Sequence, residues 1–334
     1  MAKKIKDVDY LAISTRIRTM ENSLLTRSRI DRILEARSRE EVAKVLQDCG
    51  YPELDASRPE ELDTLLAETR QAVLEDLADS VPDRGYIDIF KLKYDYHNVK
   101  AVLKARAMHV APDRMLSDMG RVSAEELREA VESGEMTGLP PELAAAAAEA
   151  KEVLDTTRDP QLSDILLDRW YYREMLLLAE KTGSAFLMGY VKIRIDAVNL
   201  RTLVRTLRMG KSGAFLRGVL FEGGYVDPET LEKIGASGGS GLAELYASTE
   251  FETAAAAGSE ALKGGSLTEF EKRCDDAVSA YLAGAAMVPF GEEPLVSYLA
   301  ARETEFTNLR ILLMGRAAGL DADVIRARLR DVQM

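Results

Sequence analysis

Apolar residues recur with a helical period along almost the whole of this chain. Those between Ile30 and Leu34 share one helical face, and so do those between Val42 and Leu46. Strict alternation of apolar and polar residues, which is typical of a half-buried strand, does not persist anywhere. The pattern therefore predicts an all-α fold.

One helical phrase occurs three times, at residues 95–103, 196–204 and 305–313. Each copy has an acid, an asparagine three residues on, an aliphatic residue, a base and two more aliphatic residues. The acids are Asp95, Asp196 and Glu305, the amides are Asn98, Asn199 and Asn308, and the bases are Lys100, Arg201 and Arg310. The copies start 101 and 109 residues apart, which is the spacing of domains rather than of solenoid repeats.

This spacing predicts three similar helical units related by approximate threefold symmetry. We place them at residues 1–155, 156–262 and 263–334, with the third unit cut short after its phrase. Such an object suits a collar, socket or adaptor better than an enzyme with a single cleft.

On a helical wheel the acid, the asparagine and the aliphatic residues of each phrase share one face, and the base lies at its edge. Buried polar groups need partners, since each unsatisfied one costs about 1–3 kcal/mol. One interpretation is structural, in which the acid and amide clamp a neighbouring helix of the same unit. The other is that these groups, with Lys100, Arg201 and Arg310, line a surface that binds a partner.

The composition of the chain excludes several classes of function. The chain has 334 residues, 56 acids and 44 Lys plus Arg, for a net charge of −12, which argues against nucleic acid as a partner. Its two cysteines, Cys49 and Cys274, are far apart and indicate free thiols in a reducing compartment. The longest uncharged stretch, 277–291, contains Pro289 and is shorter than the ~20 residues of a membrane span. We expect a cytoplasmic protein that reaches a membrane only through a partner.

Motifs for chemistry are weak. Gly210-Lys211-Ser212 resembles the end of a phosphate-binding loop, but Arg205 stands where that pattern needs glycine, so a helix end is the better interpretation. Two histidines, His97 and His109, are too few for a zinc site or a serine triad. We expect no catalytic residue, metal, cofactor or small-molecule substrate. Hydrolysis by a carboxylate pair stays open, because acids are abundant.

Taken together, these residues resemble the C subunit of the archaeal and bacterial V/A-type rotary ATPases, the counterpart of the d subunit of the eukaryotic V-ATPase. The resemblance covers nearly the whole chain. It is carried by Arg16, Leu24, Leu25, Asp31, Leu34, Leu46 and Gly50-Tyr51, by residues 94–100 and 196–201, by Gly223-Gly224, and by residues 305–310 and 325–330.

The resemblance implies a funnel of three helical units on the cytoplasmic face of the membrane rotor ring. It would receive the foot of the central shaft, which the D and F subunits form, and transmit torque without catalysing a reaction. It leaves open whether the ion is a proton or sodium and whether ATP is made or hydrolysed. The alternatives are an unrelated helical-repeat scaffold and a carboxylate-dependent hydrolase.

Overall fold

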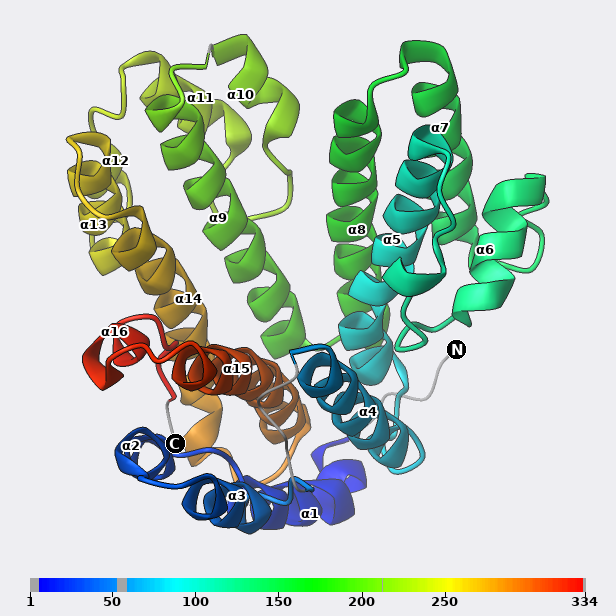
Figure 1. The fold of residues 1–334 in the computed structure, drawn as a ribbon. Helices are drawn as coiled ribbons and strands as arrows, with labels where there is room; N and C mark the ends of the chain where they lie inside the picture. Colours follow the sequence, from blue (N-terminus) through cyan, green and yellow to red (C-terminus); the bar gives the residue numbers. More distant parts are fainter. Residues whose placement is uncertain (1–5, 53–58, 212, 333–334) are drawn as a thin grey trace. The chain divides into compact units, whose positions relative to one another are not determined.

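The computed structural model describes residues 6–52, 59–211 and 213–332, and all regular secondary structure in these ranges is helical (Figure 1). The prediction of an all-α fold is therefore confirmed. The α-helices are α1 (Leu11–Glu21), α2 (Arg27–Glu35), α3 (Arg39–Asp48), α4 (Pro59–Ala78), α5 (Gly85–Met108), α6 (Ala124–Ser133), α7 (Pro141–Thr157), α8 (Pro160–Thr182), α9 (Ala185–Arg208), α10 (Gly213–Val219), α11 (Pro228–Ala236), α12 (Leu242–Leu245), α13 (Glu252–Leu262), α14 (Leu267–Ala283), α15 (Glu292–Ala317) and α16 (Ala322–Arg326). The 3₁₀ helices are η1 (Asp7–Tyr10), η2 (Asp113–Met115) and η3 (Gly284–Met287).

The chain forms two compact units. The smaller unit consists of Asp83–Lys192 with Phe221–Gly223, and the larger unit consists of Met1–Pro82, Ile193–Leu220 and Gly224–Met334. The division into three units at 1–155, 156–262 and 263–334, and their threefold arrangement, stays a prediction.

Helix α5 is the centre of the smaller unit. It carries the first copy of the phrase and packs against α6, α7 and α8. Helix starts follow the sequence signals: Ser123 Oγ accepts a hydrogen bond of 3.3 Å from the backbone N–H of Glu126, and Asp159 caps α8, which has Pro160 at its first position. These caps satisfy amide groups that a helix start leaves without partners.

The second half of α9 packs in one core of the larger unit. Leu200, Leu203 and Val204 are fully buried there with residues of α11, α13 and α14, including Phe270 and Cys274. Phe270 and Cys274 are fully buried as well. The helix that carries the second copy of the phrase is therefore surrounded by apolar side chains.

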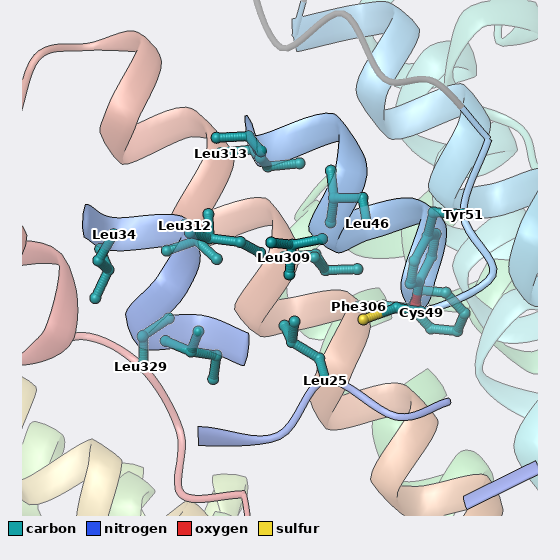
Figure 2. Close-up of a cluster of buried hydrophobic side chains, with 14 of the residues drawn as sticks. Leu25, Leu34, Leu46, Cys49, Tyr51, Phe306, Leu309, Leu312, Leu313 and Leu329 are labelled. Atoms are coloured by element: carbon teal, nitrogen blue, oxygen red, sulfur yellow. The ribbon is translucent and has the colours of Figure 1, made fainter. Parts of the chain in front are cut away.

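Helix α15 carries the third copy and packs in a second core of the larger unit (Figure 2). Leu309 and Leu312 of α15 contact a cluster that includes Leu25 and Leu46 from the beginning of the chain. Helices α1, α2 and α4 all pack on α15. Helix α15 belongs to the predicted third unit, but these three helices lie in residues 1–155, which the sequence analysis assigned to the first unit.

Across the described ranges, every helix is too short or too polar to cross a bilayer.

Candidate functional site

Asp95 on α5 forms the first of three polar clamps, each built around the acid of one phrase. Its Oδ1 accepts hydrogen bonds from the backbone N–H groups of Arg121 at 2.9 Å and of Val122 at 3.3 Å. The residue before them is Gly120, where a Cβ would collide with Asp95 Oδ1. The clamp holds the chain against α5 just before α6 begins.

Arg121 extends this clamp to α8. Its guanidinium donates to Asp95 Oδ2 through Nε and to Glu174 Oε1 through Nη1, both at 2.6 Å, and Tyr96 donates to Glu174 Oε2 at 2.8 Å. Burial raises the pKa of the Asp95 carboxyl above its ordinary value, and the positive charge of Arg121 opposes that rise. The two carboxylates therefore share one arginine instead of facing each other as an acid–base pair.

Asp196 on α9 forms the second clamp, in which each carboxylate oxygen accepts one backbone N–H group. Its carboxylate accepts from the backbone N–H groups of Tyr225 at 3.0 Å and of Val226 at 3.2 Å. The preceding Gly224 also lacks room for a Cβ, again because of the acid's Oδ1. Asp227 follows as the residue before α11.

Glu305 on α15 forms the third clamp, and two of its three partners, Leu25 and Tyr51, lie more than 250 residues earlier in the chain. Leu25, which lies just before α2, donates its backbone N–H to Glu305 Oε2 at 2.6 Å. Tyr51 donates its hydroxyl to Oε1, and Arg302 on the same helix also binds Oε1. Burial raises the pKa of the Glu305 carboxyl, while Arg302 and these hydrogen bonds act in the opposite direction.

Asn98 and Asn308 bind the chain that follows their helices. Asn98 donates through Nδ2 to the carbonyl of Ser117 at 2.7 Å and accepts from the N–H of the same residue at 2.9 Å. Asn308 makes the same pair of bonds with Arg330, at 3.0 and 2.8 Å. Asn199 is fully buried like the other two. A side-chain amide that satisfies both backbone groups of one residue fixes that segment on the helix.

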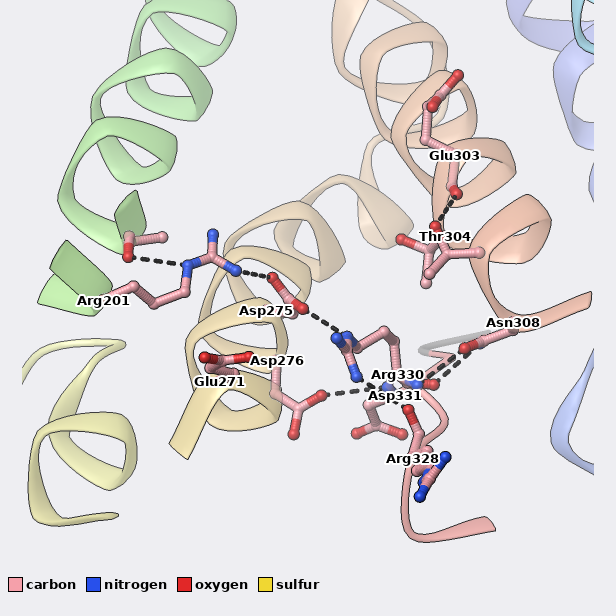
Figure 3. A network of polar contacts seen from close by, with 12 residues as sticks. Arg201, Glu271, Asp275, Asp276, Glu303, Thr304, Asn308, Arg328, Arg330 and Asp331 are labelled. Atoms are coloured by element: carbon pink, nitrogen blue, oxygen red, sulfur yellow. Dashed lines mark hydrogen bonds and ion pairs between the residues drawn. The ribbon is translucent and has the colours of Figure 1, made fainter. Parts of the chain in front are cut away.

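Each base of the phrase pairs with an aspartate of its own compact unit. Lys100 Nζ lies 2.5 Å from an oxygen of Asp168 on α8, and Arg310 Nε lies 2.6 Å from an oxygen of Asp63 on α4. Arg201 Nη1 lies 2.7 Å from an oxygen of Asp275 on α14, and Arg330 binds the other oxygen of that carboxylate (Figure 3). The helices that supply these aspartates, α4, α8 and α14, are each the α-helix that precedes a phrase helix in the chain.

All six acids and amides of the phrase are at most 2% exposed, so the expectation that they lie on the buried face is confirmed. The proposed partner-binding role of Lys100, Arg201 and Arg310 stays a prediction, and their intramolecular partners favour the structural interpretation. Among the described residues, no group of three or more His, Cys, Asp or Glu side chains is placed to hold a metal ion. His97 contacts the carbonyl of Met115 instead, at 2.9 Å.

Sequence reasoning missed several residues of the clamps. Arg121, Glu174 and Tyr51 have no helical spacing that links them to the acid they serve. Gly120 and Gly224 did carry a signal, because each is followed by a valine two residues on and by a helix start. The steric need for glycine was visible only once the acid had been placed against it.

Comparison with known proteins identifies the class. The model of the ATP synthase (C/AC39) subunit family matches residues 13–328, so this chain belongs to that family. It is therefore part of a V/A-type rotary ATPase, and its role is structural and not catalytic. The family match does not support the alternatives of an unrelated scaffold or a hydrolase.

Individual relatives align with this chain over most of their length. The chain is 24% identical to the C subunit of the V-type sodium ATPase of Enterococcus hirae, over 97% of this chain and 99% of that protein. It is 25% identical to the C subunit of the V-type ATP synthase of Thermus thermophilus, with 93% and 95% covered. It is 24% identical to the C subunit of the A-type ATP synthase of Methanocaldococcus jannaschii, with 96% and 86% covered.

Proposed function

We propose that this chain is the socket of the central stalk, which links the D and F subunits of the shaft to the membrane rotor ring. It would lie on the cytoplasmic side, bound to the membrane only through the ring. Its task is mechanical: it transmits torque between ATP turnover in the catalytic head and ion movement in the membrane.

The observation that carries this proposal is the clamp repeated on α5, α9 and α15. In each case a buried acid accepts one or two backbone N–H groups from a segment just before a short helix, and the base of the phrase binds an aspartate on a long helix. Three helices clamped in the same way support three equivalent units, as a threefold-like socket requires.

The clamps also suit a part that carries load. Buried charges that are paired resist local opening, because separating them leaves an unpaired buried charge at a cost of about 3–5 kcal/mol. Arg121 bound to two carboxylates, and Glu305 bound to three donors, are arrangements of this kind. Such joints keep the helices in a fixed relation under torque.

A complex reconstituted with and without this chain tests the proposal. We expect the catalytic head to hydrolyse ATP at nearly the same rate in both cases, and hydrolysis-driven ion uptake into vesicles to require the chain. Adding the purified chain back should restore uptake. Ion uptake that persists in its absence would show that another protein of the complex is the socket.

A further inference from the structure

Two ion pairs of opposite order join α4 to α15. Asp63 of α4 binds Arg310, with Oδ1 2.6 Å from its Nε. Arg70 of α4 lies with its Nε 3.1 Å from Oε1 of Glu303. The two residues of α4 are seven positions apart, and so are the two residues of α15. Because the earlier residue of α4 pairs with the later residue of α15, the helices are antiparallel, and both pairs fit a single register.

The pair at Asp63 does not by itself select α15, because every copy of the phrase has a base at the same position. Lys100 and Arg201 bind aspartates of α8 and α14, as Arg310 binds Asp63. An aspartate at the position of Asp63 would therefore fit the base of any of the three phrase helices.

The pair at Arg70 does distinguish between the phrase helices. Two residues before the acid of each copy stand Lys93, Arg194 and Glu303. In the same register, Arg70 would face a like charge in the first two copies and faces an opposite charge in the third. The side chains of Arg70 and Glu303 are each 18% exposed, so little water screens a charge at this place. The guanidinium also lies 4.6 Å from the ring centroid of Phe306.

Helix α5 is the competitor of α15 for α4, because it comes next in the chain. Six residues, 79–84, connect α4 to α5, which is a common length for the turn of a helical hairpin. Lys93 lies as far after the middle of this connection as Arg70 lies before it, and Lys100 matches Asp63 in the same way. A hairpin of α4 and α5 would thus satisfy Asp63 but bring two positive charges together at Arg70.

The neighbouring ion pairs of the other two pairings keep the base on the phrase helix. They are Lys104–Asp164 between α5 and α8, and Arg205–Glu271 between α9 and α14. The phrase base and its aspartate are 68 and 74 residues apart in these pairings, but 247 residues apart in α4 and α15. The reversed pair therefore occurs where chain connectivity contributes least to correct pairing.

We propose that Arg70, Lys93 and Glu303 determine which helix α4 packs on. Glu303 attracts Arg70 to α15, and Lys93 repels it from α5. Discrimination between competing partners rests on a repulsive contact in the wrong pairing as well as on an attractive contact in the right one. These three charges direct the beginning of the chain to its last long helix instead of to the helix that follows it.

Crosslinking of the full-length protein after refolding from urea tests this assignment. Treated with a bismaleimide, the variant Asp63→Cys/Arg310→Cys reports pairing of α4 with α15. The variant Asp63→Cys/Lys100→Cys reports pairing of α4 with α5. Cys49 and Cys274 are buried, so they do not react in the folded protein. We expect the crosslink to α15 to predominate when the three charges are unaltered.

Exchanging two charges should redirect α4. With Lys93→Glu/Glu303→Lys, the crosslink to α15 should fall by at least about fivefold and the crosslink to α5 should rise, because the attractive and repulsive partners have changed places. Adding Arg70→Glu to this double variant should return α4 to α15, since all three charges are then reversed together. Glu271→Lys is the matched control, because it makes the same change of charge in the ion pair with Arg205 and should leave the crosslink to α15 unchanged.

Other results would contradict the proposal. Equal crosslinking to α15 in the double variant and in the unaltered protein would show that these charges do not select the helix. A loss at α15 without a gain at α5 would contradict the role of Lys93, and a loss that Arg70→Glu does not reverse would contradict charge pairing as the cause. If circular dichroism shows that the double variant is unfolded, Lys93→Gln/Glu303→Gln decides, and an unchanged ratio of the two crosslinks overturns the proposal. Both crosslinks use the isolated chain, so their outcome leaves the socket function untouched.

Discussion

The backbone N–H of Leu25 donates a hydrogen bond to the carboxylate of Glu305, 280 residues further along the chain. In the other two clamps the corresponding amides lie only 26 to 30 residues after the acid. The first helices of the chain therefore complete the surroundings of its last long helix. The third clamp joins the two ends of the polypeptide, where the other two join neighbouring segments.

Removing the polar groups of the second clamp should destabilise the protein more than removing its base. Asp196→Ala and Asn199→Leu leave buried partners unsatisfied, at about 1–3 kcal/mol each. Arg201→Ala should cost under about 1 kcal/mol, because the pair with Asp275 is partly exposed. Urea unfolding of the three variants measures the difference, and equal losses would show that the acid and amide contribute no more than the base.

Gly224→Ala should destabilise the larger unit by about 1–3 kcal/mol, because the new methyl group overlaps Asp196 Oδ1. Gly284→Ala is the control, since nothing lies within 4 Å of a Cβ there and its φ of −57° is helical. That change should be neutral or stabilising by up to ~1 kcal/mol. Thermal melting compares the two, and similar midpoints would show that Asp196 moves aside without loss.

The buried thiol of Cys274 should make the folded protein less stable at alkaline pH. Burial raises the pKa of the Cys274 thiol to about 12, whereas an unfolded thiol ionises near ~8.5. Between these values the unfolded state has lost a proton that the folded state keeps, so stability falls as pH rises. The slope from this group approaches ~1.4 kcal/mol per pH unit.

Urea unfolding at several pH values between about 8 and 10.5 checks this slope in the wild-type protein and in Cys274→Ala. The variant should lose stability less steeply. Burial also raises the pKa of Tyr51, Tyr96 and Tyr246, so both proteins keep a common alkaline decline. Identical slopes would mean that Cys274 ionises as readily in the folded protein as in the unfolded one.

Single substitutions of Lys100, Arg201 or Arg310 by Ala should weaken assembly of the complex slightly, and the triple variant should detach head and shaft from the membrane. The reason is that contacts engaged together gain avidity beyond any one of them. The matched control replaces Arg217, Lys263 and Arg273, which also form partly exposed ion pairs. Sedimentation of membranes with bound head measures assembly. A triple variant that assembles normally would limit these bases to their intramolecular pairs.

The purified chain should not bind ATP at micromolar concentration in calorimetry. Gly210 ends the turn that follows α9 with a φ of 64°, and Arg205 occupies the position where a phosphate-binding loop needs glycine. A saturable heat of binding would require a nucleotide site that the sequence does not reveal.

The sequence predicted those features of the structure that depend on residues close together in the chain, namely helix class, buried helix faces and helix caps. The helical period gave the all-α class, and the wheel placed Asp95, Asn98 and their counterparts on the buried face, because burial follows the face of a helix. The cap at Ser123 is local in the same sense, because a serine three residues before Glu126 is a sequence signal for a helix start.

Long-range partners could not be predicted in the same way. Glu174 and Arg121 meet because α8 packs on α5, and nothing in their spacing of 53 residues indicates this. The neighbours of α15 were missed for the same reason: the sequence showed an early end to the third unit, while its remaining contacts came from residues before 82. Because helices α1, α2 and α4, which pack on α15, lie more than 200 residues before it, no periodic pattern near α15 indicates them.

The pairing of the two ends has a consequence for synthesis. Helices α2 and α3 leave the ribosome well before α15 and α16, whose side chains cover them together with residues of α4. At ~5–20 residues per second, their apolar faces wait some tens of seconds for those partners. During that interval Leu25, Leu46 and their neighbours are exposed as an aggregation hazard, which a molecular chaperone that binds apolar segments would relieve.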